Sequence, residues 1–132
     1  MHTKAIILIV DKNHDARLML TIHLSQQGFG VVSAQNIAEA LELAQEIKFD
    51  LFIVDIRLPD GDGSELCSEL KLIQPGVPVL YYTAAVLSSE KREAMSRCGD
   101  AYLAKPVCLA DIESAIMDLV FVRKPEFDKF IP

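Results

Sequence analysis

The sequence lacks tryptophan, has only three cysteines, and contains no long apolar run. Its longest apolar stretch near the N-terminus, AIILIV at positions 5–10, is too short to cross a bilayer or to form the core of a signal peptide. Basic residues are also few: 13 lysines and arginines stand against 19 aspartates and glutamates, and the net charge of −6 gives no support to direct nucleic-acid binding. We therefore expect a cytoplasmic protein with neither membrane nor direct nucleic-acid contacts.

The three cysteines, Cys67, Cys98 and Cys108, indicate neither a disulfide framework nor a metal site. Their number is odd, their spacing contains no CxxC pair, and all three lie among helix-forming residues. We predict that they are small buried apolar side chains in a reducing compartment.

The apolar residues alternate regularly between two patterns along the 132-residue chain. Short continuous runs, typical of strands buried on both faces, alternate with segments of helical periodicity. Strands are predicted at 4–10, 30–34, 50–54, 77–82 and 101–104, and helices at 14–28, 37–48, 63–76, 88–99 and 108–121. Five such units predict a doubly wound α/β fold with a parallel sheet. We assign residues 1–122 to one domain and 123–132 to a C-terminal tail or the start of a linker.

Four of the predicted strands are followed at once by a polar residue, namely Asp11, Asp55, Thr83 and Lys105. Alone, each has an ordinary explanation: an aspartate forms turns or caps helices, a threonine suits a strand, and a lysine is usually solvated. In a parallel sheet, however, all carboxyl ends lie at one edge, where α/β proteins bind their ligands. The sequence therefore predicts a site at this edge formed by all four side chains.

Four stretches carry a more specific signal: ILIVD at 7–11, LFIVDIRLPDGDG at 51–63, YYTA at 81–84 and AYLAKP at 101–106. Together, and in this order, they resemble the receiver domain of two-component response regulators over about residues 4–121. The resemblance implies a flavodoxin-like (βα)5 fold with strand order 2-1-3-4-5. It also implies a cis bond between Lys105 and Pro106.

The resemblance implies a role for each matching residue. Asp55 would accept a phosphoryl group from a sensor histidine kinase or a phosphotransfer protein, a reaction suited to a carboxylate nucleophile with fixed cations beside it. Lys105 would pair with Asp55, Thr83 would donate a hydrogen bond to the phosphoryl group, and Tyr102 would turn inward as the second switch residue. The chain would then be no enzyme beyond self-catalysed phosphoryl transfer and autodephosphorylation.

The sequence departs from the family pattern at Lys12. The family usually has two adjacent acids here, the second of which is the more direct Mg²⁺ ligand, whereas this chain has Asp11 followed by Lys12. Asp11 and Asp55 then stand against Lys12 and Lys105, so the pocket has no surplus negative charge for a divalent ion to cancel. We predict that Mg²⁺ binding by Asp11, Asp55 and the backbone carbonyl of Arg57 is weak or absent.

Three interpretations of Lys12 remain open. It could neutralise the phosphoryl group in place of the metal, it could make Asp55 a poor acceptor, or it could point outward at the strand end. In the second case the domain would act as an unphosphorylated protein-binding module. A guanidinium of Arg57 above the pocket, and an apolar Ala85 two residues after Thr83, would both favour slow loss of the phosphoryl group.

The resemblance also implies where the signal leaves the domain, on the face formed by the fourth helix, fifth strand and fifth helix. The residues after 121 are too few for a DNA-binding or catalytic segment. The partner at this face is therefore expected to be a separate downstream protein or an output domain of a longer chain, with a homodimer left open.

Overall fold

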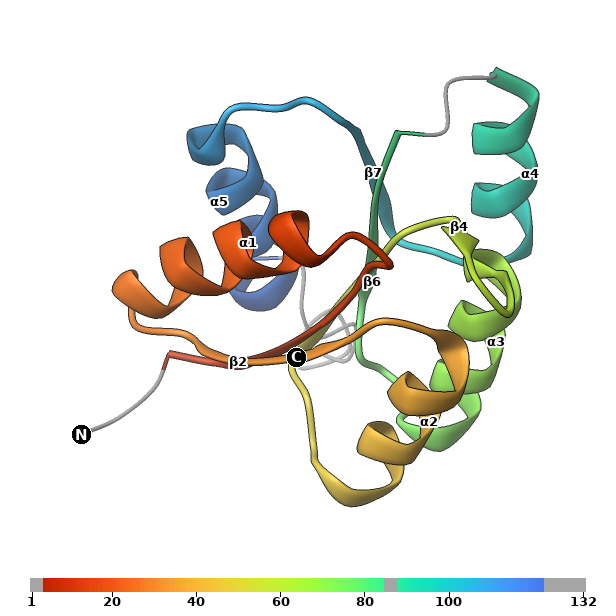
Figure 1. Cartoon of the computed structure of the whole chain (residues 1–132), viewed down its shortest axis with the longest axis horizontal. Coiled ribbons are helices and arrows are strands. Elements are labelled where there is room, and N and C mark those ends of the chain that lie inside the picture. Colours follow the sequence, from red (N-terminus) through yellow and green to blue (C-terminus); the bar gives the residue numbers. More distant parts are fainter. Residues whose placement is uncertain (1–3, 85–87, 123–132) are drawn as a thin grey trace, which may run out of the picture.

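The computed structural model describes residues 4–84 and 88–122. A five-stranded sheet forms its centre, and helices cover both faces of this sheet (Figure 1). The elements in chain order are β1 Ile6–Val10, α1 His14–Gln26, β2 Gly30–Ala34, α2 Ile37–Glu46, β3 Leu51–Val54, β4 Arg57–Leu58, β5 Gly61–Asp62, α3 Gly63–Ile73, β6 Val79–Thr83, α4 Ser88–Arg97, β7 Ala101–Ala104, α5 Leu109–Met117 and the π-helical turn η1 Asp118–Val122. The predicted tail at 123–132 lies outside the described residues.

The large sheet has the order β2-β1-β3-β6-β7, and its paired strands are all parallel. Counted among these five strands alone, the order is 2-1-3-4-5, which confirms the predicted doubly wound, flavodoxin-like fold. The antiparallel hairpin of β4 and β5, with two residues in each strand, was not predicted. It lies in the loop that follows β3.

Two apolar layers hold the sheet and helices together because successive side chains of a buried strand point to opposite faces. On one face, alternate residues of the strands pack against α1 and α5; the cluster includes Ile7, Ile9, Leu20, Leu24, Ile112 and Ile116. On the other face they pack against α2, α3 and α4; this cluster includes Leu8, Val10, Phe52, Leu66, Leu70 and Ala94. Burial on both faces explains why the central strands read as continuous apolar runs.

The loop after β3 is tied to the helices by side-chain caps. Asp62 and Glu65 form a capping box at the start of α3. The Asp62 side chain accepts a hydrogen bond from the backbone N–H of Ser64, and the Glu65 side chain accepts one from the backbone N–H of Asp62. Asp60 accepts hydrogen bonds from the first two backbone N–H groups of α2, at 2.8 and 3.1 Å. These bonds lower the pKa of Asp60. The loop that carries Asp55 is therefore held against both α2 and α3.

The prediction about the cysteines was wrong in two respects. Cys67 of α3 and Cys98, the residue after α4, form a disulfide across 31 positions of sequence. Cys108 is free and exposed rather than buried. The packing of α3 beside α4 brings Cys67 and Cys98 together, and spacing in the sequence carries no sign of that tertiary contact.

None of the helices in residues 4–84 and 88–122 combines the length and the apolar character that crossing a membrane requires.

Candidate functional site

The four predicted side chains lie at the carboxyl ends of β1, β3, β6 and β7. The hydrogen bonding of the sheet continues onto them: the N–H of Asp55 donates to the carbonyl of Val10 (2.9 Å), and the N–H of Lys105 donates to the carbonyl of Thr83 (2.8 Å). The bond between Lys105 and Pro106 is cis, as the resemblance implied. Each side chain is thus positioned by the sheet itself.

The side chains contact one another in a single pocket. The Thr83 hydroxyl donates to Asp55 Oδ1 at 2.6 Å. Lys105 Nζ donates to Asp11 Oδ2 at 2.5 Å and lies 3.6 Å from Asp55 Oδ2. Asp11, Asp55 and Thr83 are 3%, 8% and 0% exposed, so these polar groups are buried and depend on each other for hydrogen bonds. The structure therefore brings all four residues together.

Lys105 is the cation inside this pocket. Burial by itself would lower its pKa, but the hydrogen bond to Asp11 and the charges of Asp11 and Asp55 outweigh burial, so its pKa is raised. Its ammonium group also lies 5.2 Å from the centre of the Tyr82 ring. Lys105 is consequently protonated at neutral pH and sets a fixed positive charge between two carboxylates.

Lys12 and Arg57, which follow Asp11 and Asp55 closely in the sequence, are both exposed. The N–H of Arg57 donates to Asp55 Oδ1 at 3.3 Å, but its guanidinium binds both carboxylate oxygens of Glu90 in α4, at 2.7 and 2.8 Å from Nη2. The guanidinium thus links the loop after β3 to α4. Ala85 lies outside the described residues.

Tyr102 is half-buried on β7, beside Asp55's loop and the first turn of α4. The centre of the Tyr102 ring lies 6.5 Å from that of the Tyr81 ring and 5.1 Å from Lys91 Nζ. Burial raises the pKa of Tyr102, and the negative charges of Glu90 and Asp55 raise it further. The electrostatic environment of Tyr102 therefore includes both the pocket and α4.

Two residues important to this geometry were missed in the sequence. Glu90 appears there as one charge among many on a polar helix, and only the fold places it against Arg57. Gly63 begins α3 next to the backbone of Asp55, where a Cβ atom would overlap the carbonyl oxygen of Asp55. Nothing in the stretch LFIVDIRLPDGDG indicated that this glycine packs against the backbone of Asp55.

The oxygen atoms available to a metal ion are few. Asp11 and Asp55 supply the carboxylates, and the Arg57 carbonyl is the third donor predicted from the sequence. Among residues 4–84 and 88–122, no group of three or more His, Cys, Asp or Glu side chains is placed to hold a metal ion.

Comparison with known proteins gives a consistent family. The family model of the response regulator receiver domain matches residues 7–117. The chain is 32% identical over 128 residues to the transcriptional regulatory protein GlrR of Escherichia coli K12, covering 97% of this chain and 29% of that protein. It is 34% identical over 122 residues to the response regulator protein PilR of Pseudomonas aeruginosa, covering 92% and 27%. The chain thus spans less than a third of the length of these relatives.

Solved structures agree with the sequence matches. A two-component response regulator from Clostridium difficile superposes with a TM-score of 0.87 at 28% identity, covering 92% of this chain and 100% of that one. A response regulator protein from Burkholderia pseudomallei, solved with a phosphorylated aspartic acid, calcium ion and citrate, gives a TM-score of 0.78 at 29% identity, covering 89% and 66%. The chain therefore belongs to the receiver domain family of two-component response regulators.

Proposed function

We propose that Asp55 accepts a phosphoryl group from a phosphohistidine on a sensor histidine kinase or phosphotransfer protein, and that the new charge changes the domain's protein contacts. The observation that carries this proposal is the convergence of the Thr83 hydroxyl and the Lys105 ammonium on the two oxygens of the Asp55 carboxylate. A hydroxyl donor and a fixed cation beside a buried carboxylate are suited to stabilising a phosphoryl group on that carboxylate. The phosphorylated aspartic acid of the Burkholderia pseudomallei relative supports the same chemistry.

The transfer is a displacement at phosphorus. Asp55 Oδ1 already accepts hydrogen bonds from Thr83 and from the N–H of Arg57, so Oδ2 is the oxygen better placed to attack. The new O–P bond forms as the N–P bond of the phosphohistidine breaks, and the electron pair returns to the imidazole, which takes up a proton from solvent. Lys105 neutralises the phosphoryl oxygens as they approach Oδ2.

Receiver domains typically bind Mg²⁺ at the acidic pocket, and the residues of this pocket fit such an ion poorly. Lys105 holds Asp11 Oδ2, and the N–H of Asn13 donates to Asp11 Oδ1 at 2.8 Å, so both oxygens of that carboxylate are engaged. A hard divalent ion favours several free oxygen ligands over a site that already contains an ammonium group. We therefore propose that Mg²⁺ binding is weak or absent.

If Mg²⁺ is not tightly bound, another cation has to neutralise the phosphoryl group, and Lys12 is the candidate. It is exposed in this structure and has a long flexible side chain. We propose that it folds over the phosphoryl group when that group is present. The competing function is an unphosphorylated protein-binding module, which is favoured by the hydrogen bond that already occupies Asp11.

Intact-mass spectrometry of the chain after incubation with phosphoramidate, with Mg²⁺ and with a chelator, tests both proposals. We expect one phosphoryl adduct on the wild type in either condition and none on Asp55→Asn. Asp60→Asn is the matched control, because Asp60 lies on the same loop but caps α2 instead of facing the pocket. Lys12→Asp should make the adduct dependent on Mg²⁺.

Two outcomes would contradict these proposals. An adduct on the wild type that requires Mg²⁺ would exclude Lys12 as a substitute for the metal. The absence of any adduct, with phosphoramidate and with a phosphohistidine protein alike, would exclude phosphoryl transfer and favour the protein-binding module.

The partners follow from this function. We propose that the domain works in the cytoplasm, where it meets its kinase, and that a downstream protein or an output domain reads the face formed by α4, β7 and α5. Lys91, Tyr102 and Glu90 lie together at the α4 side of this face. A change at Asp55 would reach them through Arg57, which contacts both the acceptor and Glu90.

A further inference from the structure

The disulfide between Cys67 and Cys98 joins two helices at a point that neither the pocket nor the family resemblance explains. Cys67 lies in the middle of α3 and is 0% exposed, whereas Cys98 follows the last turn of α4 and is partly exposed. Their Cα atoms are 6.0 Å apart, a separation typical of disulfide-bonded cysteines. Reagents can therefore approach the bond from the Cys98 side.

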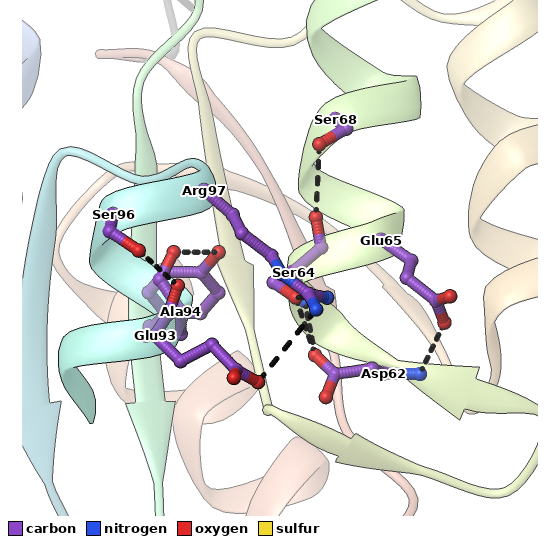
Figure 2. A network of polar contacts seen from close by, with 9 residues as sticks. Asp62, Ser64, Glu65, Ser68, Glu93, Ala94, Ser96 and Arg97 are labelled. Carbon is purple, nitrogen blue, oxygen red and sulfur yellow. Dashed lines mark hydrogen bonds and ion pairs between the residues drawn. The ribbon is translucent and has the colours of Figure 1, made fainter. Parts of the chain in front are cut away.

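Noncovalent contacts hold the same end of α4. The Tyr81 hydroxyl of β6 donates to the carbonyl of Cys98 at 2.9 Å. Figure 2 shows Arg97 extending from α4 toward Ser64 at the start of α3, with Nη1 3.4 Å from the Ser64 hydroxyl and Nη2 3.8 Å from Glu93. The carboxyl-terminal end of α4 would thus remain in place, though less firmly, without the covalent bond.

A space remains between α4, near Glu90 and Glu93, and the start of α3. A cavity of about 80 Å³ lies there, lined by Ile56, Asp62, Ser64, Glu90, Glu93 and Ala94. Glu90, which lines this cavity, also forms an exposed ion pair with Arg57, and this pair links the helix to the loop after β3. The disulfide is thus the firmest link between α3 and α4, and its loss would give the whole helix more freedom.

We propose that Cys67 and Cys98 form a reversible thiol–disulfide site whose oxidation state sets how firmly α4 is fixed to α3. Both sulfur atoms border the apolar cluster beneath α3 and α4, so the two thiols can remain there as small apolar groups after reduction. The fold therefore accommodates either state. This proposal does not depend on phosphoryl transfer to Asp55.

The chemistry is thiol–disulfide exchange with a dithiol as the co-reactant. A thiolate of the dithiol attacks the sulfur of Cys98, and Cys67 leaves as a thiolate that takes a proton from water. The second thiol of the reagent then releases Cys98 and closes its own disulfide, so two electrons pass to the protein. Oxidation is the reverse reaction, driven by a small-molecule disulfide.

The test compares the 132-residue chain in oxidised and reduced dithiothreitol, without a phosphodonor. Alkylation of the unfolded protein followed by mass spectrometry should find one free thiol, Cys108, in the oxidised form and all three cysteines free in the reduced form. On reduction, hydrogen exchange at the backbone amides of Arg97 and Cys98 should accelerate about tenfold or more.

Two variants distinguish the loss of the Cys67–Cys98 disulfide from any other effect of dithiothreitol on hydrogen exchange. Cys98→Ser should exchange like the reduced wild type in either buffer, whereas Cys108→Ser, which alters the exposed free cysteine, should respond to dithiothreitol as the wild type does. The proposal is overturned if no disulfide forms in the oxidising buffer, or if the wild type forms it without any change of exchange in α4. The wild-type comparison decides the matter even if Cys98→Ser does not fold.

Discussion

The two ends of α4 are attached to the domain in different ways. At the carboxyl-terminal end, Cys98 carries a disulfide and a hydrogen bond from the buried Tyr81, and Gly99 packs directly against the Tyr81 ring. At the amino-terminal end, Glu90 is bound by the Arg57 guanidinium, whose side chain is 58% exposed. Exposed ion pairs contribute little to stability, whereas buried and covalent contacts contribute more.

This difference indicates which part of α4 can respond to the pocket. Arg57 contacts Asp55 through its backbone and Glu90 through its side chain. A phosphoryl group on Asp55 would add negative charge close to Arg57 and compete with Glu90 for the guanidinium. We therefore expect the amino-terminal end of α4 to be released while the carboxyl-terminal end stays fixed.

The largest effect on stability is expected from Gly99→Ala, which disrupts the packing at the carboxyl-terminal end of α4. Gly99 has φ +119°, and a Cβ atom there would overlap Cε2 of Tyr81. Backbone strain and overpacking together should lower the free energy of unfolding by roughly 2–5 kcal/mol, measured by urea denaturation. Gly76→Ala is the matched control, since its φ is +90° but no atom lies within 4 Å of the added Cβ. An equal loss in both variants would show that Tyr81 does not confine this turn.

A smaller effect is expected from Tyr81→Phe, which removes the hydrogen bond to Cys98 and keeps the ring. The free energy of unfolding at neutral pH should fall by about 1 kcal/mol. Burial also raises the pKa of the Tyr81 phenol. The contribution of the neutral Tyr81 phenol to the free energy of unfolding is therefore complete below about pH 10, and it is lost as the pH rises through the raised pKa. Urea denaturation at several alkaline pH values should show a shallower loss in Tyr81→Phe than in the wild type, and identical slopes would contradict this.

The smallest effect on stability is expected from Glu90→Gln, which weakens the ion pair with Arg57 at the amino-terminal end of α4. The free energy of unfolding should change by less than about 1 kcal/mol, since the pair is exposed. Hydrogen exchange should nevertheless accelerate in the first turns of α4. Glu93→Gln is the control, because the ion pair of Glu93 is with Arg97 of the same helix and not with Arg57. Equal acceleration in the two variants would exclude Arg57–Glu90 as the specific link.

Much of the fold could be predicted because its information is local. The strands at 30–34 and 101–104 match β2 and β7 to the residue, since each is a short apolar run between helical segments. The four side chains of the pocket could be placed together for a related reason. Each directly follows a strand or, as Thr83 does, ends one, and parallel strands end at one edge of the sheet.

The contacts between helices could not be predicted in this way. The disulfide depends on how α3 packs beside α4, and the partner of Arg57 depends on which side of α4 faces the loop after β3. The hairpin of β4 and β5 has only two residues in each strand, too few to form a recognisable pattern. These features arise from tertiary packing, which leaves no periodic signal in the sequence.

The most direct test of this account is hydrogen exchange along α4 in the oxidised chain, measured with and without the phosphoryl group on Asp55. We predict that phosphorylation accelerates exchange at the amides of Arg92 and Glu93, while those of Arg97 and Cys98 remain protected. A uniform change along the helix, or a larger change at Arg97 and Cys98, would contradict the claim that α4 is released at one end and fixed at the other.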